Sequence, residues 1–158
     1  MNRPMKVALV TGAALVALYV VASLGVRGLS GARIEGNEAS AIGSLRAVLS
    51  GQYTYAATAC QGLYAPRLTV LGTGSFVSPD LGQADVVEKS GYRITMRPSD
   101  PAEPVNVVGG CADGVPGFVV TAEPLDPGTS GRRYFRAAGA GEVFEATRAD
   151  YSDAKPVR

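Results

Sequence analysis

The sequence predicts an α+β fold in which one long N-terminal helix packs on a small antiparallel β-sheet of about four strands. Three observations support this prediction. An apolar run near the N-terminus leads into a segment with helical periodicity, a glycine- and proline-rich segment follows, and strand-like segments of alternating polarity fill the second half of the chain. A helix followed by a run of strands is the element order of α+β proteins, in which helix and sheet form two layers.

Residues 7–26 contain no charged side chain, and a helix of this length is just able to cross a bilayer core of about 30 Å. Arg3 and Lys6 precede the run and favour a cytoplasmic N-terminus. We expect a retained single-pass anchor in the inner membrane, with the C-terminal domain periplasmic or at the cell surface. A cleaved signal peptide and a buried helix of a soluble protein are the alternatives.

The chain therefore divides into residues 1–31 and residues 32–158. The first part holds a cytoplasmic flank, the transmembrane helix and a glycine-rich hinge, because glycines recur between residues 25 and 36 and weaken a helix there. The second part is the extracytoplasmic domain. Its glycine and proline content favours turns and short strands over a helical bundle.

A second helix segment is expected from Asn37 as N-cap, with Glu38 in the first turn, to a glycine near residue 62. Its apolar residues recur at steps of three and four and form one packing face. The members of this face are Ile42, Leu45, Leu49 and Tyr53. Off this face lie small and polar residues, Ser44, Arg46 and Gln52 among them.

The region from residue 63 to residue 90 is broken by glycine and proline, so we expect a loop with one or two short helical turns. Strands are expected at 91–98, 117–124, 132–138 and 142–146, the last two joined by a hairpin turn at Gly-Ala-Gly. The polar C-terminal tail is expected to be loosely held.

Only two cysteines occur, Cys60 and Cys111. In a reducing compartment they would be two inert thiols, buried as small apolar groups. Export places them in an oxidising compartment, where a pair in one domain is usually bridged. We therefore expect a structural disulfide that closes a loop of roughly 50 residues and contributes about 4 kcal/mol in the chain-entropy description.

No combination of side chains predicts catalysis. The chain has no histidine, which excludes histidine-based triads and metal sites, and Ser44 near Arg46 has no accompanying base, so we expect no enzyme and no cofactor. The net charge of +1 and the scattered basic residues give no reason to expect nucleic acid as a partner.

Four weaker patterns have structural interpretations that we prefer. The Gly-Thr-Gly-Ser segment at 72–75 lacks the lysine of a phosphate-binding loop, so it is interpreted as an ordinary loop. We interpret Asp80, Asp85 and Glu88 as a solvated acidic loop, with a cation site as the alternative. We expect Tyr53, Tyr55 and Tyr64 to pack within the domain, with an aromatic contact surface as the alternative. We interpret Arg132, Arg133 and Arg136 as exposed strand charges that discourage edge pairing, with an anion-binding surface as the alternative.

The segments NEASAIGSLRAVLSGQYTYAATACQGLYAPRLTVLG and AEPLDPGTSGRRYF resemble type IV pilin-like proteins, in particular the short acidobacterial-type pilin-like family. The resemblance covers about residues 32–157. It implies a pilin or pseudopilin fold, with a long helix whose outer half packs on an antiparallel sheet. The start differs: in pilins a leader glycine, read by prepilin peptidase, is followed by a Phe-Thr-Leu-Ile-Glu-type sequence, whereas Gly12 is not followed by that pattern and no carboxylate precedes Glu35.

The resemblance implies a non-enzymatic, membrane-anchored component, structural or accessory, of a type IV pilus or type II secretion-like system. Its partners would be pilin-like or secretion-system proteins, with a homo-oligomer as a possibility. Because a buried carboxylate near the N-terminus is missing, we expect a tethered monomer or small oligomer rather than bulk filament. A true filament subunit and a secreted binding or adhesion module are the alternatives.

Overall fold

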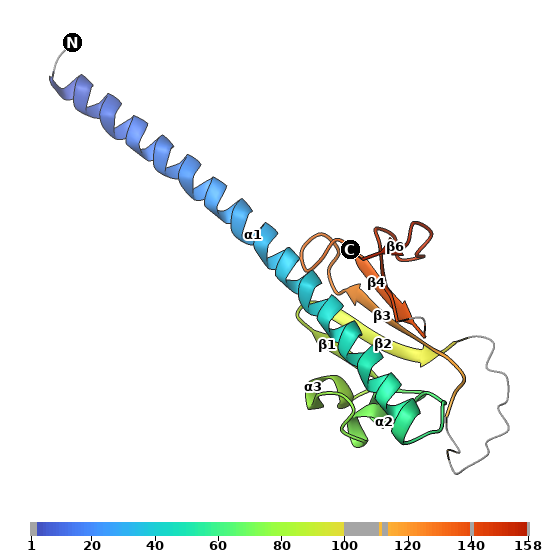
Figure 1. Ribbon diagram of the computed structural model, residues 1–158. Coiled ribbons are helices and arrows are strands. Elements are labelled where there is room, and N and C mark those ends of the chain that lie inside the picture. The colour runs from blue at the N-terminus through green and yellow to red at the C-terminus, as the bar shows by residue number, and fades with distance from the viewer. Residues whose placement is uncertain (1–2, 100–110, 112–113, 140, 158) are drawn as a thin grey trace.

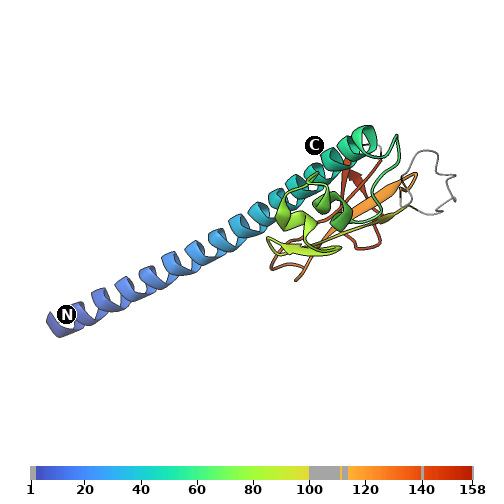
Figure 2. The ribbon, with the colours of Figure 1, turned by 90° about the horizontal axis from the view of Figure 1, so that it is seen from below.

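The computed structural model describes residues 3–99, 111, 114–139 and 141–157; of the side chains before Leu29, it describes only that of Tyr19. The first element is a helix of 56 residues, α1 (Arg3–Thr58), which by its rise of 1.5 Å per residue is about 84 Å long. Its C-terminal part lies along the sheet, and its N-terminal part extends beyond every other element (Figures 1 and 2).

α1 is continuous through the glycine-rich stretch, so the expected helix start at Asn37 is wrong. The helix is already formed on both sides of this residue, and extending it costs far less than starting a new one. The side chain of Asn37 serves a tertiary contact instead, because its Nδ2 donates to the carbonyl oxygen of Ser130 at 2.8 Å.

The end of α1 is close to the position that the sequence predicts. Gln61 and Gly62 adopt positive φ angles of 48° and 95°, which reverse the chain, and the amide of Gly62 donates to the carbonyl of Ala56 at 2.8 Å. Glycine adopts this left-handed conformation without a steric penalty, as in other helix C-terminal caps.

Two short helices follow, α2 (Leu68–Thr73) and α3 (Pro79–Gly82), which confirms the expectation of short helical turns in this region. Gly72 and Gly82 bring the two helices together, because a β-carbon on either residue would collide with the backbone of the other. Leu68, Leu71 and Leu81 point from these helices into the core.

The described strands form one antiparallel sheet in sequence order, β1-β2-β3-β4-β5-β6. It has six strands where the sequence predicts about four. The two extra strands are the outermost ones, a four-residue strand within a turn-rich segment and a two-residue strand that contains proline, and both have weak strand patterns of their own. The strands are β1 (Val86–Lys89), β2 (Tyr92–Pro98), β3 (Phe118–Pro124), β4 (Tyr134–Ala138), β5 (Val143–Ala146) and β6 (Lys155–Pro156).

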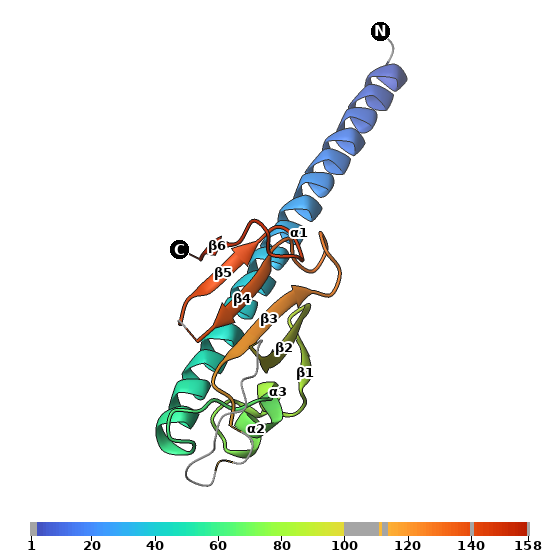
Figure 3. The same ribbon diagram turned by 90° about the vertical axis from the view of Figure 1, so that its right-hand side faces the viewer.

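The core lies between α1 and one face of the sheet. In β2 the residues Tyr92, Ile94 and Met96 are buried, and the intervening side chains turn away, as the period of two in the sequence predicts. Leu45 and Val48 of α1 are fully buried against this inner face. We call the opposite side, turned away from α1, the outer face of the sheet; Figure 3 looks onto it with α1 behind.

Candidate functional site: the projecting helix and its attachments

The N-terminal part of α1 projects without contact to the sheet. Among the described side chains of the helix, Ile34 is the first that the domain buries, whereas Leu29 is 74% exposed and Tyr19 76% exposed. Residues 7–26 thus belong to the part of α1 that extends beyond the sheet (Figure 1). How firmly, and in which direction, this helix leaves the domain depends on the attachments that begin just after Ile34.

The first attachment is a buried carboxylate on α1. Glu38 is only 4% exposed, and its Oε1 accepts hydrogen bonds from the backbone amides of Arg132 and Arg133 at 2.8 and 3.2 Å. Its Oε2 accepts from Nε of Arg133 at 2.8 Å and lies 2.7 Å from Nη2 of the same guanidinium. Both carboxylate oxygens are therefore bonded to the segment that enters β4.

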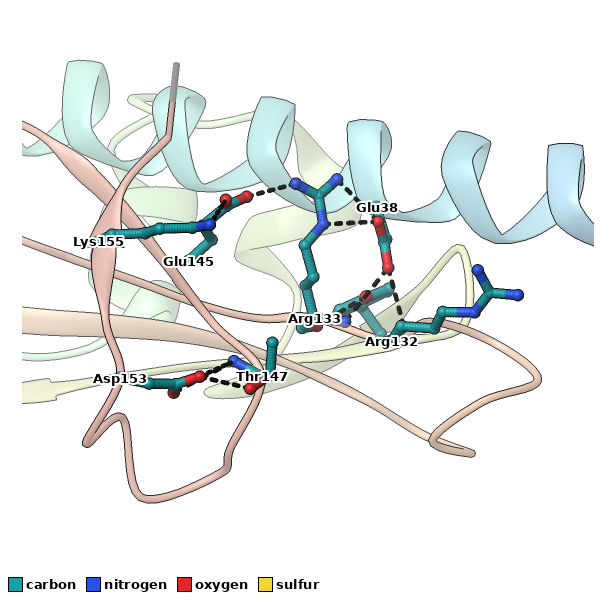
Figure 4. A network of polar contacts seen from close by, with 8 residues as sticks. Glu38, Arg132, Arg133, Glu145, Thr147, Asp153 and Lys155 are labelled. Carbon is teal, nitrogen blue, oxygen red and sulfur yellow. Dashed lines mark hydrogen bonds and ion pairs between the residues drawn. The ribbon is translucent and has the colours of Figure 1, made fainter.

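Arg133 extends the contact to the far edge of the sheet (Figure 4). Its Nη1 pairs with Oε2 of Glu145 on β5, and Oε1 of Glu145 lies 3.5 Å from Nζ of Lys155 on β6. Burial disfavours the charged guanidinium, but the hydrogen bonds that it donates to Glu38 and Glu145 outweigh this effect and raise the pKa of Arg133. We call Glu38, Arg133, Glu145 and Lys155 the Glu38 network; it joins α1 to β5, to β6 and to the segment that enters β4.

Tyr92 supports this network from within the sheet. Its hydroxyl donates to the carbonyl of Arg133 at 2.9 Å, and its ring packs on Phe135 at a centroid distance of 5.8 Å. Burial, together with the nearby charge of Glu38, raises the pKa of the Tyr92 hydroxyl. The phenol is therefore held in its neutral, hydrogen-bond-donating form across the physiological range.

The second attachment is Gln52, which is fully buried near the C-terminal end of α1. Its Oε1 accepts from the amide of Ala65, its Nε2 donates to the carbonyl of Ala65, both at 2.8 Å, and Nε2 also lies 3.0 Å from Sδ of Met96. One side chain thus fixes the returning chain after α1 and contacts β2.

The third attachment is the disulfide between Cys60 and Cys111, which confirms the sequence prediction. It closes a loop with a sequence separation of 51, and its two Cα atoms lie 5.5 Å apart. Beside it, the isolated bridge between Tyr64 and Val115 joins the same two segments through paired backbone hydrogen bonds. The bridge and the disulfide together hold the end of α1 to the segment that leads into β3.

The predicted packing face of α1 is distributed unevenly in the structure. Leu45 and Leu49 lie in the core, Ile42 is partly buried against it, and Tyr53 is 41% exposed and donates its hydroxyl to the carbonyl of Gly139. The deepest face of the helix is rotated toward Ala41, Val48 and the polar residues. Ser44, expected on the surface, is buried with its hydroxyl donating to the carbonyl of Ser40.

The three acidic residues weighed as a cation site do not converge. Asp80 pairs with Lys89, and this hydrogen bond lowers the pKa of Asp80; Glu88 pairs with Arg93. Asp85 accepts from the hydroxyl of Thr69 at 2.6 Å. In the part of the chain that the structure describes, no group of three acidic or cysteine side chains is placed to hold a metal ion.

The Gly-Thr-Gly-Ser segment covers the C-terminal end of α2 and the residues after it. A helix C-terminus carries a partial negative charge, which is the wrong sign for a phosphate. Gly72 and Thr73 therefore end a helix, and Gly74 and Ser75 form the turn after it, where the sequence predicts an ordinary loop.

The tyrosines contact the domain's own aromatic residues, as packing predicts. Tyr64 lies edge-on to Phe118 at 5.0 Å and 6.4 Å from Tyr53, and Tyr55 lies edge-on to Phe76 at 5.4 Å.

The arginines differ from their prediction as exposed charges that protect a sheet edge. β4 lies inside the sheet, and Arg133 is bound within the Glu38 network. Arg132 and Arg136 do have exposed side chains.

The residues that sequence reasoning missed are Glu38 and Gln52 as interior contacts. Both occur on a helix face that is otherwise apolar, and this is the only signal the sequence offers. Their partners are backbone groups and an arginine about 90 residues later, so periodicity does not reveal them. Next to the Glu38 network is a depression of about 410 Å³ lined by Arg133, Glu145, Lys155, Pro156 and Val157. Its charged groups are already paired with one another, so it is best understood as part of the attachment.

Within the part of the chain whose side chains the structure describes, no helix is long and apolar enough to cross a membrane; of residues 7–26, only Tyr19 belongs to that part. No family profile, no curated protein and no solved structure matches the chain.

Proposed function

We propose that this chain is a non-enzymatic, membrane-anchored pilin-like protein, a structural or accessory component of a type IV pilus or type II secretion-like system that acts through protein contacts. The observation that carries the proposal is the architecture of α1. The helix is fixed to the sheet by the Glu38 network, Gln52 and the disulfide, while its N-terminal part projects beyond the sheet (Figure 1).

The physical argument concerns the apolar surface of the projecting part. A helix that is apolar all round is stable only when lipid or protein surrounds it. Residues 7–26 are apolar and the domain covers none of the described side chains before Ile34. Burial of apolar area contributes about 25 cal/mol per Å², so a bare helix of this length in water would associate with itself or with a bilayer. We infer that its natural surroundings are a bilayer.

The spacing between anchor and domain fits this arrangement. About eight residues, or about 12 Å of helix, separate residue 26 from Ile34. If residues 7–26 cross the bilayer, the sheet would sit close to the lipid headgroups, held by a helix without a flexible linker. A domain held in this way presents its surface to neighbouring membrane proteins at a constant height and orientation. This is the property that a structural or accessory subunit needs.

The experiment is fractionation of cells that produce the full chain, followed by alkaline carbonate extraction of membranes and protease treatment of spheroplasts. We expect the chain to stay in the membrane pellet, with the domain accessible to protease. A variant carrying Val16→Arg and Val20→Arg tests the anchor directly, because charges at the bilayer centre are costly. It should move to the soluble fraction, whereas Ser50→Arg on the exposed side of α1 should not.

Release of the unaltered chain by carbonate would disprove the anchor. Intact mass of the membrane-extracted protein then separates the alternatives. A loss of the N-terminal residues would indicate a secreted module. Electron microscopy of sheared surface fractions with antibody against the domain tests the filament subunit, for which labelling would be continuous along filaments.

A further inference from the structure

The outer face of the sheet holds a pocket that the Glu38 network does not use. It has a volume of about 320 Å³ and is lined mainly by apolar groups. Arg136 and Ala138 of β4 and Phe144 of β5 form its floor on the sheet, and Tyr151 and Ala154 belong to the loop between β5 and β6. We call it the outer-face pocket. Its size and mostly apolar lining resemble those of small-molecule sites, which begin at about 300 Å³.

The wall of the pocket is ordered by specific contacts. Tyr151 has a φ angle of 56°, a conformation that a bulky residue adopts only when its surroundings require it. Its hydroxyl donates to the carbonyl of Phe135 at 3.1 Å, so the ring is bound to the sheet. Asp153 accepts hydrogen bonds from the amide and hydroxyl of Thr147 and thereby closes the base of the loop (Figure 4). The pocket is therefore formed before any ligand binds.

The polar group at the pocket is Arg136. Its neighbours in the sheet register are Thr121 on β3 and Phe144 on β5, neither of which carries a charge. Among the described residues no carboxylate forms an ion pair with Arg136, in contrast to Arg133 and Arg93. An exposed cation beside an apolar cavity therefore remains without an anion from the described part of the chain.

An acidic residue on the same face is Glu123, two positions along β3 from Thr121, the residue that faces Arg136. Glu123 faces Arg93 in the sheet register, but within the described part of the chain the ion pair of Arg93 is with Glu88, and Glu123 forms no ion pair with Arg93 or Arg136. This acidic and basic row lies next to the pocket but does not line it. The guanidinium of Arg136 thus remains available to a carboxylate, which it binds in a bidentate geometry.

We propose that the outer-face pocket binds an aromatic or aliphatic group that carries a carboxylate. The apolar group would lie against Phe144, Tyr151 and Ala138, and the carboxylate would pair with Arg136. Two sources have this chemistry, a free small organic acid and the C-terminal residue of a peptide chain. The pocket lies entirely on the described sheet and its loop, so binding there does not require the anchor proposed above.

The experiment uses the full chain in lipid nanodiscs, with methyl-labelled alanine observed by NMR. The probes are phenylacetate and its uncharged counterpart phenylacetamide, and the peptides acetyl-Gly-Phe as free acid and as amide. We expect phenylacetate to shift the methyl signals of Ala138 and Ala154 saturably while those of Ala41 and Ala65 in the core stay unchanged. Phenylacetamide should bind at least about tenfold more weakly than phenylacetate, since a hydrogen bond to a charged group is lost.

Two variants separate the charge from the cavity. Arg136→Gln should remove the preference for acid over amide, whereas Arg93→Gln on the same face should keep it. Phe144→Ala should weaken the binding of both phenylacetate and phenylacetamide. A preference for the peptide acid over phenylacetate would assign the site to chain ends, and the reverse order to free organic acids.

Three results would overturn the proposal: no saturable shift at Ala138 and Ala154, equal binding of acid and amide, or an unchanged preference in Arg136→Gln. If the variant shifts the core methyl signals and so disturbs the fold, the comparison of acid and amide on the unaltered chain decides alone.

Discussion

At the scale of single residues, Glu38 joins α1 to the sheet through directional polar contacts. A carboxylate that loses its water must recover several hydrogen bonds, and Glu38 recovers them from two backbone amides and one guanidinium. The geometry is directional, so it orients the helix as well as attaching it. Apolar contacts such as those of Leu45 contribute burial but tolerate rotation and sliding of the helix.

We predict that Glu38→Ala and Arg133→Ala each lower the free energy of unfolding by about 2–3 kcal/mol. This is below the range for fully buried pairs, because Arg133 is 38% exposed and water replaces part of its interaction. The double variant should cost less than the sum of the two. The measurement is urea unfolding followed by circular dichroism.

Glu35→Ala is the matched control, since Glu35 lies on the exposed side of the same helix turn. It should change stability by no more than about 0.5 kcal/mol. Additive effects of Glu38→Ala and Arg133→Ala would show that the two side chains are not coupled.

We also predict an alkaline limit to stability that depends on Tyr92. Burial raises the pKa of Tyr92, and likewise that of Tyr151, above the ordinary value of 10.0. The neutral phenol is thus favoured in the folded state, so its contribution is fully present below about pH 10 and is lost as pH rises toward the folded-state pKa. Tyr92→Phe should reduce the fall in the urea midpoint between pH 9 and 11.

The double variant Tyr92→Phe with Tyr151→Phe should flatten the profile further. Tyr53→Phe is the control variant, because it also removes one tyrosine hydroxyl, but from a partly exposed ring. A profile in Tyr92→Phe as steep as that of the unaltered chain would contradict the prediction.

At the scale of elements, the end of α1 is held by one side chain and one covalent bond. Gln52 gives the backbone of Ala65 both a donor and an acceptor, as a neighbouring strand would. The chain after α1 therefore packs beside the helix without being in a sheet or a helix itself. Cys60 then joins this region to the segment before β3.

Replacement of Gln52 by Ala should leave two buried backbone groups of Ala65 without partners. At about 1–3 kcal/mol for each unsatisfied group, we expect a loss of about 2–6 kcal/mol if water does not enter. Hydrogen exchange of the Ala65 amide should accelerate more than that of Ile94 in the sheet. Gln83→Ala, at an exposed position, should have almost no effect; equal loss in both variants would contradict the assignment.

Removal of the disulfide should lower stability by about 4 kcal/mol in the chain-entropy description, given a sequence separation of 51. The variant is Cys60→Ala with Cys111→Ala, compared with the oxidised chain by urea unfolding. Non-reducing peptide mapping of the native protein should recover the linked peptides. A variant as stable as the oxidised chain would show that the backbone bridge of Tyr64 and Val115 is sufficient.

At the scale of the whole molecule, the domain and the projecting helix are structurally independent. The sheet, the short helices and the packed part of α1 share one core, and the described side chains before Ile34 take no part in it. The domain should therefore fold without the projecting part, while the projecting part should depend on its surroundings.

We predict that a chain beginning at Ala32 is soluble and folded. Its amide spectrum should match that of the full chain for the sheet, since every attachment of α1 lies after this residue. A second truncation beginning at Gly43 removes Glu38 and should unfold more easily, by about the cost of Glu38→Ala or more. A molten spectrum for the first truncation would show that the projecting helix stabilises the domain.

The sequence by itself determined the classes of element and their order. The continuous apolar run, the step of three to four in α1 and the step of two in β2 follow from local geometry, and local geometry leaves a pattern in neighbouring residues. The same reasoning covers the cysteine pair, because only two cysteines occur. The number of strands could not be predicted correctly from the sequence, because β1 and β6 are stabilised by the neighbouring strands β2 and β5 rather than by their own composition.

Only the tertiary structure decided how these elements are joined. Glu38 and Arg133 are 95 positions apart, Gln52 bonds to a backbone group, and Tyr151 reaches the outer face from a loop. A polar side chain on a helix has the same sequence pattern whether it meets water or a buried partner. Its role is set by what the folded chain places opposite it, and that depends on contacts between residues far apart in the sequence.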